Sequence, residues 1–373
     1  MSKPVNIVYY HDALIPRHSI SVFEVLIGRL IRTAPVGAKV TILCQSFNCD
    51  PKLQRNNSAT DFIFINTSSK SKLRTVIARQ LLRIFSSKHD EVTVIVNMMN
   101  IYTVWIWSIL ARMCGCYSIC RFTGLTPTKK RDFIKQLSRN TLIFLSVHLC
   151  HHTISVSKNL GAFIKNIAPS REVSVVNQGV AGIFLTTKIN DKILMSVTDY
   201  VFIGRLVKNK GIIQLVEAFL QLSGRCRSLK IIGHGPLYEK VKIMTEGHTN
   251  IILCGPRSQA EIVQTLISSS TLILPSDHEG TPNVLLEAMA THTFVLASDV
   301  GESRTLIGSD RGLLLRSNSV GDIKEGILAS EVIAHRQEIL KRAHDLVFNE
   351  YNETMTQNRM NNLIETFLNR DDR

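Results

Sequence analysis

SDHEGTPNVLLEAMA, residues 276–290, follows a short apolar run, TLILP, at residues 271–275. An apolar run of this length is typical of a buried strand, and Pro282 stands where a proline commonly begins a helix. Glu279 is therefore expected in a loop between a strand and a helix, where side chains can face a ligand. Asn283 and Glu287 are four residues apart, so we expect them on one face of that helix, near amides that attract an anion. The alternative is an ordinary amphipathic helix whose glutamate is solvated.

A second glycine-containing loop precedes this segment. Residues 200–203 predict a strand, residues 204–211 read GRLVKNKG, and residues 212–222 have the apolar spacing of a helix. Gly204 allows the backbone to approach a ligand, while Arg205 and Lys210 can bring two positive charges to one diphosphate. A solvated basic loop at the start of a helix would have the same composition.

Further strands, each followed by a turn, are predicted at 229–232, 251–255 and 294–298. Glycines Gly233, Gly235 and Gly255 lie where the first two of these strands end. Strands that alternate with helices predict an α/β protein with a doubly wound parallel sheet, which binds ligands at the carboxyl ends of its strands.

Taken together and in this order, these segments resemble the retaining glycosyltransferases of GT-B fold, in particular glycosyltransferase family 4, also called group 1. The resemblance rests on GRL with Lys210-Gly211, on GHGP at 233–236, on Pro275-Ser276, on EGTPNVLLEAMA at 279–290 and on DVG at 299–301. It covers residues 195–315 well and the first 185 residues only in outline. It implies two Rossmann-like domains that face each other across a cleft.

The resemblance also implies a role for each matching residue. Glu279, Arg205 and Lys210 would be the catalytic residues, with the two cations on the donor diphosphate and Glu279 on hydroxyls of the transferred sugar. The donor-binding residues would be Gly204, Gly233, Gly235, Gly255, Asn283, Val284 and Glu287. Among these, Glu287 would hold the ribose, and the amides of Asn283 and Val284 would face phosphate oxygens. In the mechanism favoured for the family, the leaving phosphate takes the proton of the acceptor.

The first part of the chain departs from the family pattern in two places. Many relatives have a glycine pair after the first strand, whereas residues 16–21 here read PRHSIS. Many also have a histidine-glycine pair after a later strand, where this chain has Arg121, Thr123 and Gly124. No catalytic histidine is therefore predicted.

Length and composition predict two domains, since 373 residues exceed the usual size of one core. The acceptor-binding domain is expected at 1–185 and the donor-binding domain at 186–352, with a polar linker at 186–196. Residues 353–373 are expected to contain a closing helix that crosses back toward the first domain.

The charge of the chain is concentrated in its first half. Residues 1–185 contain 23 Lys and Arg and 8 Asp and Glu, a net 23 − 8 = +15, whereas the rest has 44 − 23 = 21 basic and 30 − 8 = 22 acidic residues. One basic cluster, residues 70–85, is interleaved with apolar residues, and a second lies at 129–139. The predicted acceptor or membrane contacts are Arg74, Arg79, Arg83, Lys129, Lys130 and Arg131.

Basic amphipathic helices bind anionic membrane surfaces, which suits a polyprenyl-pyrophosphate-linked or glycan acceptor. The alternative for these clusters is a solvated helix face. Nucleic acid is not expected as a partner, because no zinc spacing, aromatic RNP-like run or helix-turn-helix signature accompanies the charge.

Residues 92–112 are apolar enough to suggest a membrane span, but their polar residues favour a strand followed by a helix. The amino terminus has no long apolar signal core, so we expect a cytoplasmic protein, peripheral on the inner face of the plasma membrane. The eight cysteines have no Cys-x-x-Cys spacing, which predicts reduced thiols. We expect no metal and no other cofactor, the nucleotide sugar being a substrate.

The function expected from the sequence is transfer of a sugar, preferably from a UDP-sugar, to a hydroxyl of a lipid-linked or growing glycan in bacterial surface polysaccharide biosynthesis. A GT-B epimerase or phosphorylase would share the fold and differ in its products. A non-catalytic scaffold would bind the nucleotide without turnover. A membrane-binding module would account for the basic residues and leave the second domain unexplained.

Overall fold

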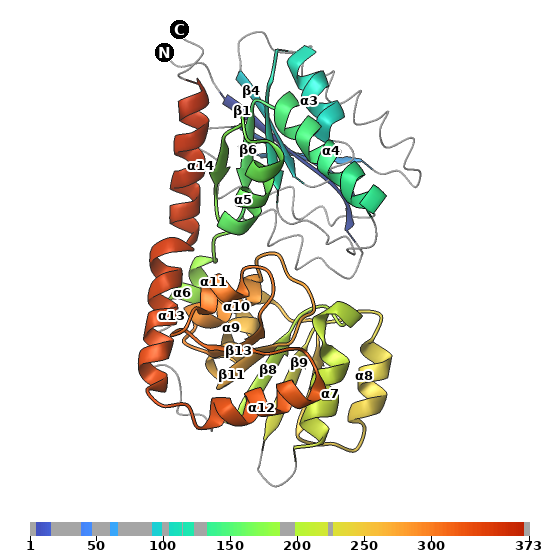
Figure 1. Ribbon diagram of the computed structural model, residues 1–373, viewed down its shortest axis with the longest axis vertical. Helices are drawn as coiled ribbons and strands as arrows, with labels where there is room; N and C mark the ends of the chain where they lie inside the picture. The colour runs from blue at the N-terminus through green and yellow to red at the C-terminus, as the bar shows by residue number, and fades with distance from the viewer. Residues whose placement is uncertain are drawn as a thin grey trace. The chain divides into compact units, whose positions relative to one another are not determined.

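A computed structural model describes residues 5–15, 39–46, 60–65, 92–98, 104–113, 115–122, 133–186, 198–222 and 227–368. The chain forms two compact units, residues 1–177 with 356–373, and residues 178–355 (Figure 1). The basic residues predicted to contact the acceptor or the membrane, namely Arg74, Arg79, Arg83, Lys129, Lys130 and Arg131, lie outside the described residues, as does the linker from 187 onward.

The first unit is built on a parallel sheet of order β3-β2-β1-β4-β5-β6-β7. Its elements are β1 (Val5–Ile15), β2 (Lys39–Ser46), β3 (Thr60–Ile65), β4 (Val92–Met98), α3 (Val104–Met113), β5 (Tyr117–Phe122), α4 (Phe133–Leu149), β6 (His152–Ser155), α5 (Lys158–Ile167) and β7 (Val173–Val175). The predicted strand and helix over 92–112 are confirmed as β4 and α3. Within the described part of the chain, no helix has the length and apolar character that a membrane crossing requires.

The second unit has a parallel sheet of order β10-β9-β8-β11-β12-β13. Its elements are α6 (Gly182–Leu185), β8 (Asp199–Ile203), η3 (Lys208–Lys210), α7 (Ile212–Leu220), β9 (Ser228–Ile232), α8 (Tyr238–Thr245), β10 (Ile251–Gly255), α9 (Gln259–Ile267), β11 (Thr271–Leu274), α10 (Asn283–Ala290), β12 (Phe294–Ser298), α11 (Ser303–Ile307), β13 (Leu313–Leu315), α12 (Val320–Glu331) and α13 (Arg336–Glu350). The doubly wound parallel sheet predicted from the sequence is confirmed.

Each face of the second sheet is covered by its own group of helices. Helices α7, α8 and α12 bury Tyr200, Phe202 and Leu296 on one face. Helices α6, α9, α10, α11 and α13 bury Val201, Leu272 and Val295 on the other. The strands are therefore apolar on both sides, which explains why they appear in the sequence as continuous apolar runs.

The boundary between the units falls at residue 177, whereas the sequence placed it at 185. Helix α6 accounts for the difference, because Phe184 is fully buried in the core of the second unit. Helix α14 (Glu353–Leu368) begins in the second unit, and its residues from Thr356 belong to the first, where Met360 and Ile364 are buried. Its Thr356 hydroxyl donates to the carbonyl of Asn177 at 3.3 Å.

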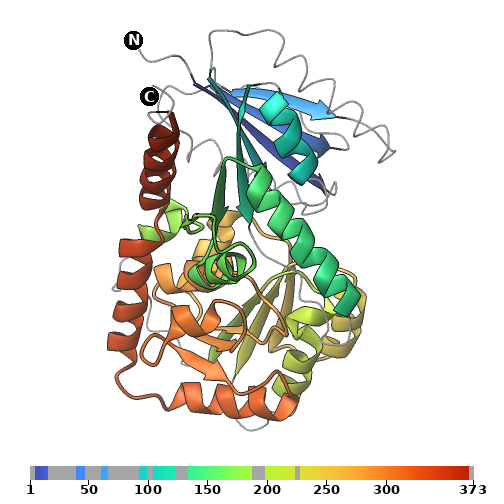
Figure 2. The same cartoon turned by 45° about the horizontal axis from the view of Figure 1, so that its top comes forward.

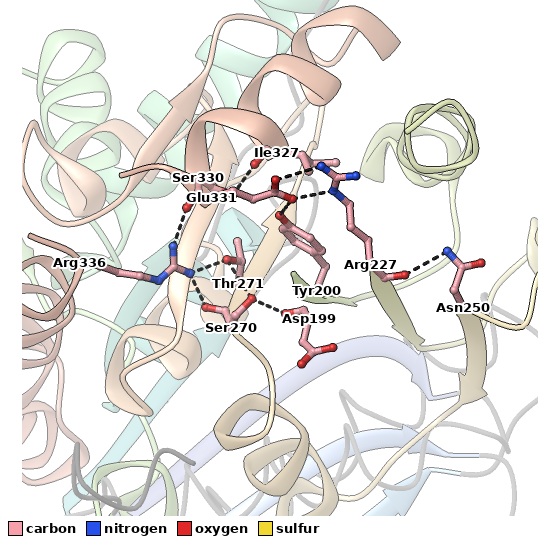
Figure 3. Close-up of polar contacts among 10 residues, drawn as sticks. All are labelled: Asp199, Tyr200, Arg227, Asn250, Ser270, Thr271, Ile327, Ser330, Glu331 and Arg336. Carbon is pink, nitrogen blue, oxygen red and sulfur yellow. Dashed lines mark hydrogen bonds and ion pairs between the residues drawn. The ribbon is translucent and has the colours of Figure 1, made fainter. Parts of the chain in front are cut away.

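A buried polar network lies at the amino ends of β8, β9, β10 and β11 (Figure 3). Arg227 donates to both carboxylate oxygens of Glu331, at 2.6 and 2.9 Å, and the two side chains are only 3% and 1% exposed. The Tyr200 hydroxyl donates to the same carboxylate at 2.9 Å. Arg336 donates to the carbonyls of Ser330 and Ser270, at 2.7 and 2.8 Å, and its burial lowers its pKa to about 10.

We predict that Glu331→Gln strongly destabilises the protein. The substitution leaves the buried Arg227 guanidinium without a counter-charge, which commonly costs about 3–5 kcal/mol. Urea unfolding of the full-length chain measures this loss. The matched control is Glu325→Gln, which removes a partner of Arg316 in a pair that is 83% and 68% exposed and should change stability by less than about 1 kcal/mol. Equal stabilities of the two variants would contradict a stabilising role for the buried pair.

Candidate functional site

The candidate site lies where the order of strands in the second sheet reverses. After β8 the chain adds β9 and β10 on one side, then returns to pair β11 with the other side of β8. The loops that follow β8 and β11 therefore begin side by side at the carboxyl edge and lead in opposite directions, which is where open α/β sheets bind ligands. These loops carry Arg205 and Lys210, and Ser276 and Glu279.

An ion pair joins the two loops. Lys210 Nζ lies 2.5 Å from Glu279 Oε1, and the side chains are 22% and 9% exposed. The buried Ser276 hydroxyl donates to the same carboxylate oxygen at 2.7 Å. The second carboxylate oxygen, Oε2, has no hydrogen-bond partner among the described residues. Glu279 thus has a fixed orientation, and within the described part of the chain its Oε2 is free to accept a hydrogen bond.

Backbone contacts hold the loops together beneath this pair. Gly211 has a φ of +66°, and a Cβ there would lie 2.0 Å from the carbonyl oxygen of Pro275. Only glycine fits so close an approach at this φ. The Asp277 amide donates to the carbonyl of Asn209 at 2.9 Å, and the Asp277 carboxylate accepts from the Asn318 side chain. The relative position of the two loops is consequently fixed by backbone contacts as well as by the ion pair.

The two predicted phosphate-binding cations differ in their surroundings. Lys210 is paired with Glu279, whereas Arg205 is exposed and its guanidinium has no partner among the described residues. Arg205 is therefore free to bind an anion directly.

The loop after β9 packs closely against the loop after β8. A Cβ at Gly233 would lie 1.9 Å from the Gly204 carbonyl oxygen, and one at Gly235 would lie 2.6 Å from that of Leu206. The Gly233 amide also donates to the carbonyl of Gly255 at 3.0 Å. These close approaches are a structural reason for glycine at 233 and 235, in addition to the ligand contacts predicted for them.

Helix α10 begins at Asn283, directly after Pro282, as the sequence predicts. The amides of Asn283 and Val284 have no hydrogen-bond acceptor within the described residues, so they remain available to an anion. Asn283 and Glu287 lie one turn apart on this helix, and both are half-buried.

Sequence reasoning missed several residues that support Glu279. Ser276 was noted only as part of a motif, although a hydroxyl three residues before a loop carboxylate is a possible partner for it. Gly301, also noted only as part of a motif, has a φ of +57° and brings the loop after β12 so close that a Cβ would lie 2.3 Å from the Glu279 carbonyl oxygen. The neighbouring amide of Glu302 donates to the carbonyl of Gly280 at 3.0 Å. Asn318 comes from the segment after β13, and no local pattern connects it with Asp277.

The arrangement suits a ligand that combines a polyanion with neutral hydroxyls. Arg205 and the first amides of α10 offer positive potential, whereas Glu279 Oε2 can accept from a hydroxyl. Among the residues the structure describes, no three His, Cys, Asp or Glu side chains gather closely enough to hold a metal ion.

Comparison with known proteins agrees with this geometry. Residues 198–330 match the family described as Glycosyl transferases group 1. TuaC of Bacillus subtilis, whose name assigns it to teichuronic acid biosynthesis as a glycosyltransferase, is 33% identical over 131 residues, which is 35% of this chain and 32% of TuaC. The lipopolysaccharide 1,2-N-acetylglucosaminetransferase of Salmonella typhimurium is 26% identical over 52% of this chain and 57% of its own length. The chain thus spans about a third to a little over half of these relatives.

Structural similarity extends over both units. The structure of HepE from Anabaena in complex with UDP and glucose covers 97% of this chain and 100% of its own, with a TM-score of 0.72 at 12% identity. This similarity shows the fold alone. Residues 198–330 thus match the group 1 glycosyltransferase family, within a chain of two-domain, Rossmann-like GT-B fold.

Proposed function

We propose that the protein transfers a sugar from a nucleoside diphosphate sugar, preferably a UDP-sugar, to a hydroxyl of a lipid-linked or growing glycan, with retention of the anomeric configuration. The observation that carries the proposal is the Lys210–Glu279 pair between the loops after β8 and β11. Arg205, which has no partner among the described residues, lies on the same loop as Lys210. This pair lies inside the segment that matches group 1 glycosyltransferases.

The electrostatics of the site support a sugar diphosphate as the ligand. A lone carboxylate beside a diphosphate would repel it, but Lys210 neutralises Glu279 at 2.5 Å. Glu279 Oε2 can then accept from a sugar hydroxyl. The diphosphate would lie at Arg205, the amides of Asn283 and Val284, and the N–H groups of Lys210 that Glu279 does not use. The site therefore accommodates both halves of the donor without placing like charges in contact.

In the proposed reaction, the bond between the anomeric carbon and the diphosphate breaks while the acceptor oxygen bonds to the same face of that carbon. The proton of the acceptor passes to the leaving phosphate. The task of the protein is to stabilise the charge that develops on this phosphate, and preorganised cations and amides commonly contribute several kcal/mol to such stabilisation. Arg205, Lys210 and the amino end of α10 have this role in the proposal.

The comparisons support particular choices of donor and acceptor. A neighbour solved with UDP and glucose favours UDP as the nucleotide. Relatives named for teichuronic acid and lipopolysaccharide biosynthesis favour an acceptor in bacterial surface polysaccharide assembly. An acceptor of this kind on a lipid carrier would bring the protein to the cytoplasmic face of the plasma membrane, with the +15 net charge of residues 1–185 toward anionic lipid.

The proposal is tested by incubating the protein with a panel of UDP- and GDP-sugars and extracted lipid-linked glycans. Mass spectrometry should detect an acceptor whose mass has risen by one sugar. Release of an isomerised nucleotide sugar would indicate an epimerase, and formation of a sugar phosphate would indicate a phosphorylase. Nucleotide binding without any product would indicate a donor-binding scaffold.

We predict that Arg205→Ala and Lys210→Ala each lower turnover by about two orders of magnitude or more, because each removes positive charge from the leaving phosphate. Steady-state rates of the purified variants, together with their circular dichroism spectra, measure this effect. Lys208→Ala is the matched control, since this exposed cation lies on the same loop and has no predicted role. A folded Lys210→Ala variant with wild-type rates would remove Lys210 from the site.

We predict that the two glutamates affect different steps. Glu287→Ala should weaken the binding of free UDP, because Glu287 is assigned to the ribose. Glu279→Ala should leave UDP affinity nearly unchanged and reduce sugar transfer, because UDP lacks the hydroxyls that Glu279 would bind. Isothermal titration calorimetry with UDP, alongside turnover measurements, distinguishes them. If both variants bound UDP as the wild type does, the assignment of Glu287 would be wrong.

A further inference from the structure

Helix α4 has large apolar side chains on two opposite faces, and on the exposed face Ser138 and Thr141 lie among them. Ile143, Val147 and the following Cys150 are fully buried against the sheet, between α3 and α5. On the outward face, Ile134, Leu137, Phe144 and Leu145 are 82%, 56%, 43% and 38% exposed. Successive members of this set are three, seven and one residues apart. In a helix of 3.6 residues per turn, this spacing places all four on one side of the helix. We call these four residues the α4 stripe.

Helix α3 also has exposed apolar residues. Helix α3 packs beside α4, as Figure 2 shows, and the Arg112 side chain at its end donates to the carbonyl of Leu149 at 2.8 Å. Ile109 and Met113 of α3 are also exposed, Met113 to 78%. An exposed cluster of large apolar side chains on a folded protein commonly marks an interaction surface.

The charge of the same segment indicates the partner. Neither α3 nor α4 contains an aspartate or a glutamate. Residues 104–150 contain seven Lys and Arg and one Asp, a net 7 − 1 = +6. Of these cations, Arg121 is buried, and Lys129, Lys130 and Arg131 contribute by their sequence position, directly before α4. Self-association through this surface would bring two such positive segments together, whereas an anionic lipid surface would attract both the charge and the apolar stripe.

We infer that the α4 stripe inserts into the interfacial region of an anionic lipid bilayer and holds the protein at the membrane. The inference rests on the proposed function in one respect, since a lipid-linked acceptor requires access to the membrane. It does not involve the basic segment at 70–85, because the apolar side chains that it names belong to α4.

The test uses the full-length chain and vesicles of phosphatidylcholine and phosphatidylglycerol in equal parts. The triple variant Ile134→Gln, Leu137→Gln and Leu145→Gln should bind these vesicles at least about tenfold more weakly in co-sedimentation, because three apolar side chains no longer leave water on binding. The matched control is Ile243→Gln, Val332→Gln and Phe348→Gln, which removes exposed apolar residues of the second unit and should bind as the wild type does. Binding of the wild type should weaken in high salt and on pure phosphatidylcholine.

A second variant, expected to bind more tightly, tests the inference even if the triple variant does not fold. Leu137→Trp should bind anionic vesicles more tightly than the wild type does. Its tryptophan emission on these vesicles should lie at shorter wavelength than that of the wild type on the same vesicles. Absence of vesicle binding by the wild type, or equal binding by the triple variant, overturns the inference. A wild-type dimer that the triple variant dissociates would also overturn it, in favour of self-association.

Calorimetry with UDP in the absence of lipid separates this inference from the proposed function. The triple variant should bind UDP as the wild type does, since none of its substitutions lies in the second unit. Vesicle binding without any UDP binding would contradict the proposed donor and leave the membrane surface intact. UDP binding without vesicle binding would contradict the membrane surface alone.

Discussion

The pairing of β8 with both β9 and β11 is the constraint on which the site depends. Parallel strands place all their carboxyl ends at one edge, and the reversal of order at β8 separates the two loops that begin there. The Lys210–Glu279 pair then joins these loops, and its two residues are 69 positions apart in the sequence. The close backbone approaches at Gly211, Gly233 and Gly301 also fix the positions of these loops, which make no strand pairing of their own.

The ion pair also lowers the free energy of the site before a ligand binds. A carboxylate that is only 9% exposed would be costly without a partner, so Lys210 and Ser276 stabilise Glu279 before any ligand arrives. Both contacts use one oxygen of the carboxylate. Fixing this oxygen restricts the direction of the other, so the orientational entropy of Glu279 is already lost when a ligand binds.

The sequence was most informative where local chemistry decides the structure. Strands β8 to β12 were recognisable because buried parallel strands are continuous apolar runs that end in glycine turns, and α10 was recognisable from Pro282. The contact between Lys210 and Glu279 was not, because it depends on β11 pairing with β8, and no local pattern specifies that order. The unit boundary was misplaced for a related reason, since Phe184 belongs to the second core through tertiary packing alone. The α4 stripe was missed because four apolar residues on a helix look alike in the sequence whether they face a core or the solvent.

The return of α14 to the first unit has a consequence for the order in which the protein folds during synthesis. Residues 178–355 can complete their own core as soon as they have left the ribosome, including the buried ion pair between Arg227 and Glu331. The first unit, although made earlier, lacks the buried side chains of Met360 and Ile364 until nearly the whole chain has been translated. The nascent first unit therefore has an uncovered apolar surface while the second unit is being made, and it is during this interval that protection from aggregation matters most.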